Sequence, residues 1–252
     1  MAEPTFKDHF SGHASDYSRY RPSAYPAALF KALAPLAPDL ECVWDCATGN
    51  GQAALGLAGH FQRVEATDAS DKQITAAVAH PKIHYSVAPA EASGLPDRSV
   101  ALVTVAQALH WFDLPRFYTE VRRVAKPEAV LACWCYMRCT VNAGVDAATE
   151  RLYNGILGDA YWPPERKHVE NAYRDLAFPF TRIVLPNFHM QVDWTLEAYV
   201  GYLRSWSATQ NYIKRNGTDP LELVGDELLG SWGDPAASRE VRWPLTTLVG
   251  WI

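Results

Sequence analysis

Short apolar runs alternate with longer amphipathic segments through the first half of the chain. The runs are rich in Val and too short for helices, so they predict strands. The segments between them predict helices. This alternation is typical of a doubly wound, mostly parallel α/β sheet with helices on both faces. Predicted strands cover 42–46, 63–68, 83–87, 100–105 and 130–135, and predicted helices cover 23–36, 51–60, 71–79 and 113–125.

The pattern changes after about residue 138. Residues 139–238 are rich in Tyr, Trp, Pro and Arg and predict a mostly helical region, with one strand at 181–185. Residues 239–252 predict two strand-like pieces around Pro244, because proline cannot donate a ladder hydrogen bond. The sequence therefore predicts a helical cap inserted before the last strands of the sheet.

Composition and charge narrow the functional class. A chain of 252 residues with 48% apolar residues can form one large domain with a cap. The net charge of −5 gives no electrostatic case for nucleic-acid binding. No apolar run is long enough to span a membrane, and the first residues lack a signal-peptide pattern, so we expect a cytoplasmic protein.

The five cysteines predict buried, reduced thiols. Most lie in or beside apolar strand-like runs. Their C-x3-C and C-x-C spacings lack the usual flanks of a zinc site, so no metal is expected.

The segment 43–52 predicts a nucleotide cradle. An apolar strand ends in Asp45 and enters a turn with Gly49 and Gly51, where the backbone can adopt positive φ and a ligand can approach closely. The helix that follows turns its free N–H groups toward the turn. Asp68 ends the next predicted strand, where a carboxylate can accept both hydroxyls of a ribose.

Two cofactor classes fit this cradle. Residues 49–54 formally satisfy the dinucleotide fingerprint G-x-G-x-x-G/A, which would suit a nicotinamide-dependent dehydrogenase. Asp45 argues against a pyrophosphate there, since like charges repel. S-adenosylmethionine (SAM) carries an ammonium and a sulfonium, so an acid near the strand end favours SAM.

Four blocks of sequence carry a resemblance to a known family. They are residues 10–26 around Tyr20-Arg21-Pro22, the cradle at 45–52 with 67–70, the segments 88–97 and 106–112, and 120–136. On these blocks the chain resembles the class I SAM-dependent methyltransferases of the type 11 group, and within them the trans-aconitate methyltransferase-like branch. The resemblance implies a seven-stranded Rossmann-like sheet with an antiparallel C-terminal strand.

The resemblance also implies roles for individual residues. Residues 1–138 would form an N-terminal lid and the SAM-binding core, 139–238 the cap and substrate region, and 239–252 the strands that complete the sheet. His110 and Trp111 would face the sulfonium and the substrate as catalytic residues. Cap residues predicted to contact the substrate are Tyr136, Arg138, Trp162, Arg204 and Trp206. Residues predicted to bind SAM are Tyr20, Arg21, Asp45, Ala47, Thr48, Gly49, Gly51, Gln52, Asp68, Ala69, Ala90, Glu91 and Gln107.

The chain departs from the family pattern at four places. Ala47 replaces a third turn glycine, Pro89 and Ala101 replace common aspartates, and Glu128-Ala129 replaces a Gly-Gly turn. The methyl group of Ala47 would narrow the approach to the methionine end of SAM.

The leading hypothesis is a SAM-dependent methyltransferase acting on a small molecule, with S-adenosylhomocysteine as product. A carboxylate acceptor would need no general base, whereas a hydroxyl, amine or carbon acceptor would need one, and His110 is the candidate. The alternatives are a non-catalytic SAM- or metabolite-binding protein and the dehydrogenase. We expect a monomer or homodimer without nucleic-acid or membrane partners.

Overall fold

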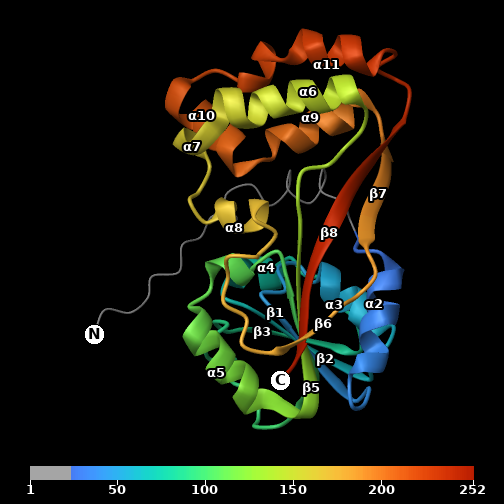
Figure 1. Cartoon of the computed structure of the whole chain (residues 1–252), viewed down its shortest axis with the longest axis vertical. Coiled ribbons are helices and arrows are strands. Elements are labelled where there is room, and N and C mark those ends of the chain that lie inside the picture. Colours follow the sequence, from blue (N-terminus) through green and yellow to red (C-terminus); the bar gives the residue numbers. More distant parts are fainter. Residues whose placement is uncertain (1–23) are drawn as a thin grey trace.

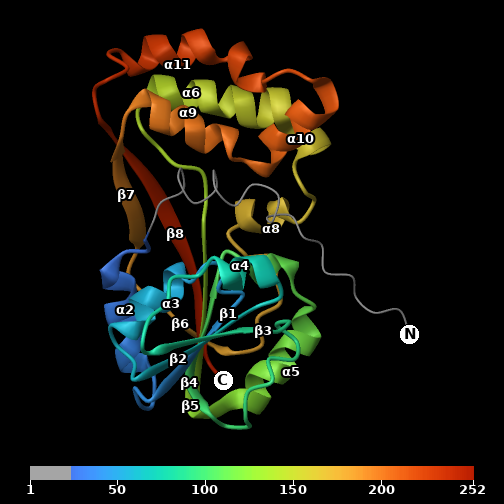
Figure 2. The same cartoon turned by 180° about the vertical axis from the view of Figure 1, so that it is seen from behind.

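The computed structural model describes residues 24–252. The predicted lid residues Tyr20 and Arg21 lie outside the described residues. Figure 1 shows a sheet with flanking helices in the lower half and a layer of helices above one end of the sheet. A long two-stranded ribbon joins the two parts, and the same arrangement is visible from behind (Figure 2).

Eight strands form one mixed sheet in the described part of the chain. Its path is β3-β2-β1-β4-β5-β8-β6, and β7 pairs with β8 alone. The first five strands of the path are parallel, and β8 runs antiparallel to β5. This confirms the predicted doubly wound sheet with an antiparallel C-terminal strand. The strands are β1 Cys42–Cys46, β2 Arg63–Asp68, β3 Ile83–Val87, β4 Val100–Ala106, β5 Ala125–Tyr136, β6 Thr181–Ile183, β7 Phe188–Trp194 and β8 Arg239–Trp251.

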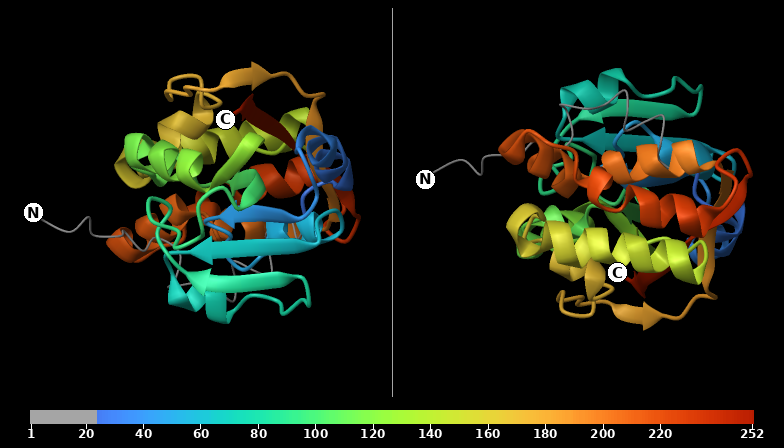
Figure 3. Two further views of the ribbon diagram at one scale, coloured as in Figure 1. Left: turned by 90° about the horizontal axis from the view of Figure 1, so that it is seen from below. Right: turned by 90° about the horizontal axis from the view of Figure 1, so that it is seen from above.

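Helices cover both faces of the sheet, as the views along the long axis show (Figure 3). On one face α2 and α3 pack with Val43, Leu102 and Trp134, and on the other α5 packs with Trp44 and Val103. Because β1 and β4 are covered on both faces, they are almost continuously apolar. The helices are α2 Ala27–Leu33, α3 Gln52–Ala58, α4 Asp71–Thr75 and α5 Leu114–Val124, with short 3-10 turns at Ala34–Leu36 and Leu109–Trp111.

The end of the chain forms one strand, so the prediction of two strand-like pieces around Pro244 is wrong. Arg242 exchanges both backbone hydrogen bonds with Thr140, so Pro244, two residues on, turns its nitrogen to the same side. The ladder with β5 ends at Leu245 paired with Tyr136, so no ladder bond is lost at Pro244. The sequence prediction also missed β7, which pairs with the first half of β8.

Strand β5 begins earlier than predicted. It runs from Ala125, and its pairing with β4 shifts register between Val100 and Leu102. Glu128, where the family has a glycine, adopts a left-handed φ of 62°. The strand therefore keeps the irregular conformation that a glycine would favour.

The cap is helical and is fixed to the sheet by the ribbon of β7 and β8. Trp243 of β8 donates from Nε1 to the Tyr202 hydroxyl at 3.0 Å, and Trp194 of β7 packs edge-on against Trp243. Seen from above, the cap helices lie over the end of the sheet (Figure 3). The cap elements are α6 Ala143–Glu150, a π-helix Arg151–Leu157, α7 Gly158–Tyr161, α8 Arg166–Glu170, α9 Leu196–Arg204, α10 Ser207–Asn216, a 3-10 turn Pro220–Leu223 and α11 Gly225–Trp232.

All five cysteines are buried free thiols, as predicted. Between residues 24 and 252, no helix has the length and apolar character needed to cross a bilayer. Over the same range, no cluster of three or more His, Cys, Asp or Glu side chains is arranged to hold a metal ion.

Candidate active site

The turn after β1 has the backbone of a ligand cradle. Gly49 and Gly51 have φ values of 57° and 90°, a region that favours glycine. Among residues 24–252, a Cβ on Gly49 would find only the side-chain oxygen of Gln73, at 3.9 Å, so the described part of the chain leaves space beside this glycine. A Cβ on Gly51 would meet the Tyr85 hydroxyl at 2.2 Å. Gly49 therefore leaves room for a ligand, whereas Gly51 makes room for the ring of Tyr85.

Asp45 stabilises the turn from inside. Its side chain is fully buried, and its two oxygens accept hydrogen bonds from Thr48 Oγ1 at 2.6 Å and Thr104 Oγ1 at 2.8 Å. Burial raises the pKa of Asp45 to about 6, against these hydrogen bonds and one from the Ala54 amide. This carboxyl group joins the end of β1, the turn and the first turn of α3.

Asp68 lies at the end of β2, beside the turn. Its Oδ2 accepts from the Gly49 amide at 2.9 Å, and its Oδ1 accepts from the Ser70 amide at 2.8 Å. These two bonds fix the carboxylate at the carboxyl edge of the sheet, next to the glycine turn. Ala69 follows at the same edge, and Gln52 begins α3.

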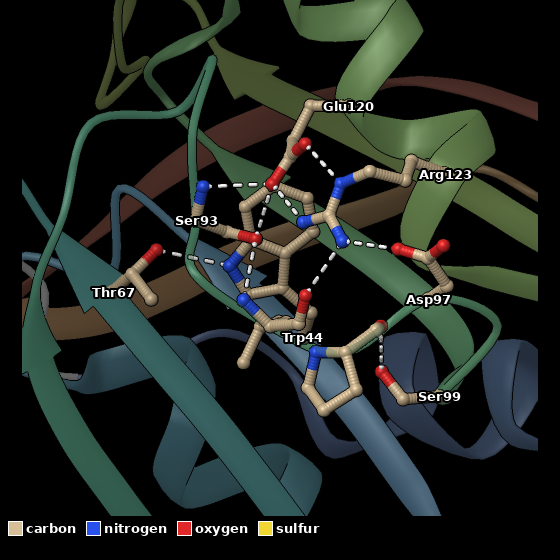
Figure 4. A network of polar contacts seen from close by, with 9 residues as sticks. Trp44, Thr67, Ser93, Asp97, Ser99, Glu120 and Arg123 are labelled. Atoms are coloured by element: carbon tan, nitrogen blue, oxygen red, sulfur yellow. Dashed lines mark hydrogen bonds and ion pairs between the residues drawn. The ribbon is translucent and has the colours of Figure 1, made fainter.

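A polar network holds the loop after β3, which contains Ala90 and Glu91. Glu120 of α5 accepts from both the amide and the hydroxyl of Ser93, at 2.8 and 2.6 Å. Arg123 binds Glu120 and Asp97 and donates to the Leu95 carbonyl. Figure 4 shows how these side chains tie α5 to the loop. Glu91 itself accepts from the Asp113 amide at 3.0 Å, so the loop is fixed at both ends.

Two residues at the ends of β1 and β4 have unusual backbones. Ala47 and Gln107 adopt φ values of 55° and 59°, although neither is a glycine. Gln107 is held by its backbone and by its side chain: the backbone N–H donates to the Trp134 carbonyl, and Nε2 donates to the Tyr136 carbonyl. Left-handed non-glycine residues cost free energy and cluster at functional sites, so their position at neighbouring strand ends marks this edge of the sheet.

His110 is held neutral at the same edge. It lies in the 3-10 turn after β4, and its Nδ1 is 3.0 Å from the Tyr173 hydroxyl. Burial lowers the pKa of His110 to about 3, and the nearby side chains of Arg166 and His168 add to the effect. The Trp111 ring packs against the imidazole at 4.8 Å between centroids. At neutral pH the imidazole is therefore uncharged and a weak base.

The cap brings three of the five predicted substrate residues together. Arg138 stacks over the Tyr153 ring at 4.8 Å and pairs with Glu150. Trp162 and Trp206 pack against Tyr153 and against each other, with centroid distances of 4.6, 5.6 and 5.5 Å. Tyr136 lies buried at the end of β5.

Arg204 does not join this cluster. It lies on the exposed side of the cap and pairs with Asp219 at 2.9 Å. Tyr153, which the sequence already placed among the aromatic residues of the cap, contacts Trp162 and Trp206. The structure adds two residues that the sequence prediction did not include, Arg166 and Tyr173. An aromatic-rich cap was visible in the sequence, but nothing in its pattern selected these members.

The chain matches known methyltransferases over most of its length. Residues 44–133 match the family described as methyltransferase domain. A Dictyostelium discoideum protein described as a methyltransferase is 32% identical over 235 residues, covering 90% of this chain and 87% of that protein. A solved structure from Anaeromyxobacter dehalogenans, described as a type II methyltransferase, is 46% identical, covers 92% of this chain and 98% of its own, and has a TM-score of 0.87.

The description of a third relative includes the methyl donor. A Saccharomyces cerevisiae protein described as an S-adenosylmethionine-dependent methyltransferase is 26% identical over 134 residues, which are 50% of this chain and 46% of that protein. The glycine turn, the acid at the end of β2 and the sheet order agree with these relationships. The chain therefore belongs to the class I S-adenosylmethionine-dependent methyltransferases.

Proposed function

We propose that this enzyme transfers the methyl group of SAM to a carboxylate oxygen of a small molecule. The observation that supports a carboxylate is the state of His110, the group predicted as a general base. With a pKa of about 3 and Nδ1 engaged by Tyr173, this imidazole is poorly suited to remove a proton from a hydroxyl or an amine. A carboxylate is already ionised and needs only to be oriented.

The residues at the carboxyl ends of the strands fit SAM. Within residues 24–252 the space beside Gly49 suits the methionine portion, and the position of the Asp68 carboxylate, at the end of β2 beside the turn, suits the ribose hydroxyls. Ala90 and Glu91, on the braced loop after β3, are proposed to flank the adenine. Asp45 acts through the turn it stabilises, since it is fully buried.

When bound, SAM supplies a methyl group that the sulfonium charge has already activated. The work left to the protein is orientation and exclusion of water. A neutral His110 can donate a hydrogen bond from Nε2 to the acceptor when the Tyr173 hydroxyl donates to Nδ1. We place the acceptor between this edge of the sheet and the cap, where Trp162 and Tyr153 lie. The resemblance to the trans-aconitate methyltransferase-like branch, named for an acid, supports the same acceptor class.

The test is methyl transfer from labelled SAM to a panel of small carboxylic acids, alcohols and amines. We expect label in products that mild alkali releases as methanol, which identifies methyl esters. His110→Gln should keep activity within about tenfold, because its amide can donate, whereas loss of a general base costs about 10²–10⁴-fold. Methylation of alcohols or amines with none of the acids would contradict the proposal.

Asp68 is the clearest test of cofactor binding. Asp68→Ala removes a charged acceptor for two ribose hydroxyls, so we expect the affinity for S-adenosylhomocysteine to fall roughly 10–100-fold. Titration calorimetry measures it. Asp71→Ala, an exposed acid in the next helix, is the matched control and should bind normally. Unchanged affinity in Asp68→Ala would refute the ribose assignment.

A further inference from the structure

Arg166 differs from the other arginines around the aromatic cluster of the cap. Its Nε donates to the Tyr153 hydroxyl at 2.9 Å. In residues 24–252 no carboxylate lies within ion-pair distance of its guanidinium, and its two terminal nitrogens have no hydrogen-bond partner. The neighbouring cations are paired: Arg138 with Glu150, Arg151 with Glu227 and Arg204 with Asp219.

Aromatic rings fix the orientation of this guanidinium. It lies 5.3 Å from the centroid of Trp162 and 5.8 Å from that of Tyr153. The Tyr153 hydroxyl accepts from Arg166 and in turn donates to Glu170. Stacking and the single Nε bond leave the outer edge of the planar fork available, which is the edge that binds carboxylates in a bidentate manner.

The position of Arg166 links the cap to the reactive edge of the sheet. It begins α8, which lies between the cap helices and the sheet in both side views (Figures 1 and 2). Its positive charge acts on His110, which lies at the end of β4, and on Tyr173 and Cys135. A half-buried cation without an ion-pair partner in residues 24–252 therefore acts electrostatically on the residue predicted to face the acceptor.

We propose that the terminal nitrogens of Arg166, backed by Trp162 and Tyr153, bind the carboxylate of the methyl acceptor. The inference rests on the proposed function. Each carboxylate oxygen has two acceptor positions, so an oxygen held by the guanidinium keeps a lone pair for attack on the methyl carbon. The bond formed is then O–CH₃, the bond broken is S–CH₃, and the electron pair of that bond stays on sulfur.

The test compares Arg166→Gln, Arg166→Lys and Arg215→Gln. Arg215 is the matched control, because it stacks over the Tyr161 ring at 5.7 Å but lies on the exposed surface of α10. We measure KM and kcat for an acid that the wild type methylates and the affinity for S-adenosylhomocysteine. The primary amide of the same acid, tested as a competitive inhibitor, reports on recognition of the charge.

We expect Arg166→Gln to raise KM roughly 10–100-fold, as for loss of a charge-assisted bidentate contact, and to remove the preference for acid over amide. Arg166→Lys should lie between it and the wild type. Affinity for S-adenosylhomocysteine should stay unchanged in every variant, and Arg215→Gln should behave as wild type.

Three results would overturn the inference. An unchanged KM in Arg166→Gln would do so while leaving the carboxyl methyltransferase proposal in place. A parallel loss of S-adenosylhomocysteine affinity would assign Arg166 to packing of the cap instead. Methylation of alcohols or amines but of no acid would refute the proposed function itself, and the role of Arg166 with it.

Discussion

At the scale of single residues, the site depends on backbone conformations that its side chains do not favour. Ala47 and Gln107 are left-handed at the ends of adjacent strands. For an L-residue this conformation costs about 1–2 kcal/mol. The alanine that narrows the glycine turn is therefore also a strained residue.

Replacing Ala47 with glycine should relieve this strain. The gain of about 1–2 kcal/mol is offset by about 0.5–1 kcal/mol for the extra conformational entropy that glycine loses on folding, so we expect Ala47→Gly to stabilise the protein by up to about 1.5 kcal/mol. Denaturant unfolding measures it. Ala32→Gly, inside α2, should instead destabilise by about 1 kcal/mol. A loss of stability in Ala47→Gly would show that the alanine methyl group has a packing role.

Asp45 should make stability depend on pH. Its pKa of about 6 in the folded protein exceeds the unfolded value of about 4, so the folded state binds more protons in this window. Stability contributed by the protonated form is then lost as pH rises from about 4 to 6, and on the order of 3 kcal/mol is involved.

Asp45→Asn cannot titrate, so it tests this directly. The stability of Asp45→Asn minus that of wild type should increase between pH 4 and 7 in cofactor-free protein. The charge of Asp68 and the titration of His110 are common to both proteins and cancel in the difference. Asp71→Asn should show no such trend, and a flat difference for Asp45→Asn would mean that the carboxyl group titrates normally.

At the scale of elements, the backbone of the segment after α8 positions the hydroxyl group of Tyr173 against His110. Ala172 and Tyr173 are consecutive left-handed residues, with φ values of 53° and 57°. The result is a buried Tyr173 whose hydroxyl meets His110 Nδ1. The Tyr173 hydroxyl can either donate to Nδ1 or accept from it, so this contact governs which ring nitrogen of His110 carries the proton.

Removing the Tyr173 hydroxyl should let the ring proton of His110 occupy either nitrogen. In Tyr173→Phe we expect the ¹⁵N shifts of the His110 ring to move toward a mixture of tautomers and kcat to fall roughly tenfold, with KM little changed. Tyr118→Phe is the control, since Tyr118 is a buried tyrosine that donates to the Ala177 carbonyl and not to His110. Identical ring shifts in wild type and Tyr173→Phe would exclude a positioning role.

At the scale of the whole molecule, β8 joins the sheet to the cap. Its later residues pair with β5 and β6, and its first half pairs with β7 beneath the cap helices. Trp243 lies fully buried in this ribbon, between Trp194 and Tyr202. Because the same strand serves both parts, the cap and the sheet are held as one unit.

Trp243→Ala should therefore destabilise the entire protein. We expect a loss of about 3–5 kcal/mol, as for other buried aromatic truncations, with tryptophan fluorescence and circular dichroism reporting one coincident transition. Trp251→Ala, at the 41% exposed end of the same strand, should cost far less. Two separate transitions in the wild type would show instead that the cap unfolds independently.

The sequence by itself determined the features that follow from short-range residue patterns, namely the parallel strands and the glycine cradle. Apolar alternation located the strands from β1 to β4, and the spacing of Gly49, Gly51 and Asp68 located the cradle, because parallel strands end at one edge of a sheet. The sequence prediction overlooked β7, although Phe188–Trp194 alternates strictly between apolar and polar residues, as expected of a half-buried strand.

Tertiary structure alone decided which cap residues face the reactive edge. Tyr173 contacts His110 across 63 positions of sequence. Arg166 differs from Arg204 because the fold stacks it on Trp162 and Tyr153, whereas Arg204 is exposed and paired with Asp219. No periodic pattern encodes such pairs, since they depend on how α8 and the β7–β8 ribbon pack against the sheet. The cofactor edge could thus be predicted from the sequence, whereas the proposed acceptor side required the fold.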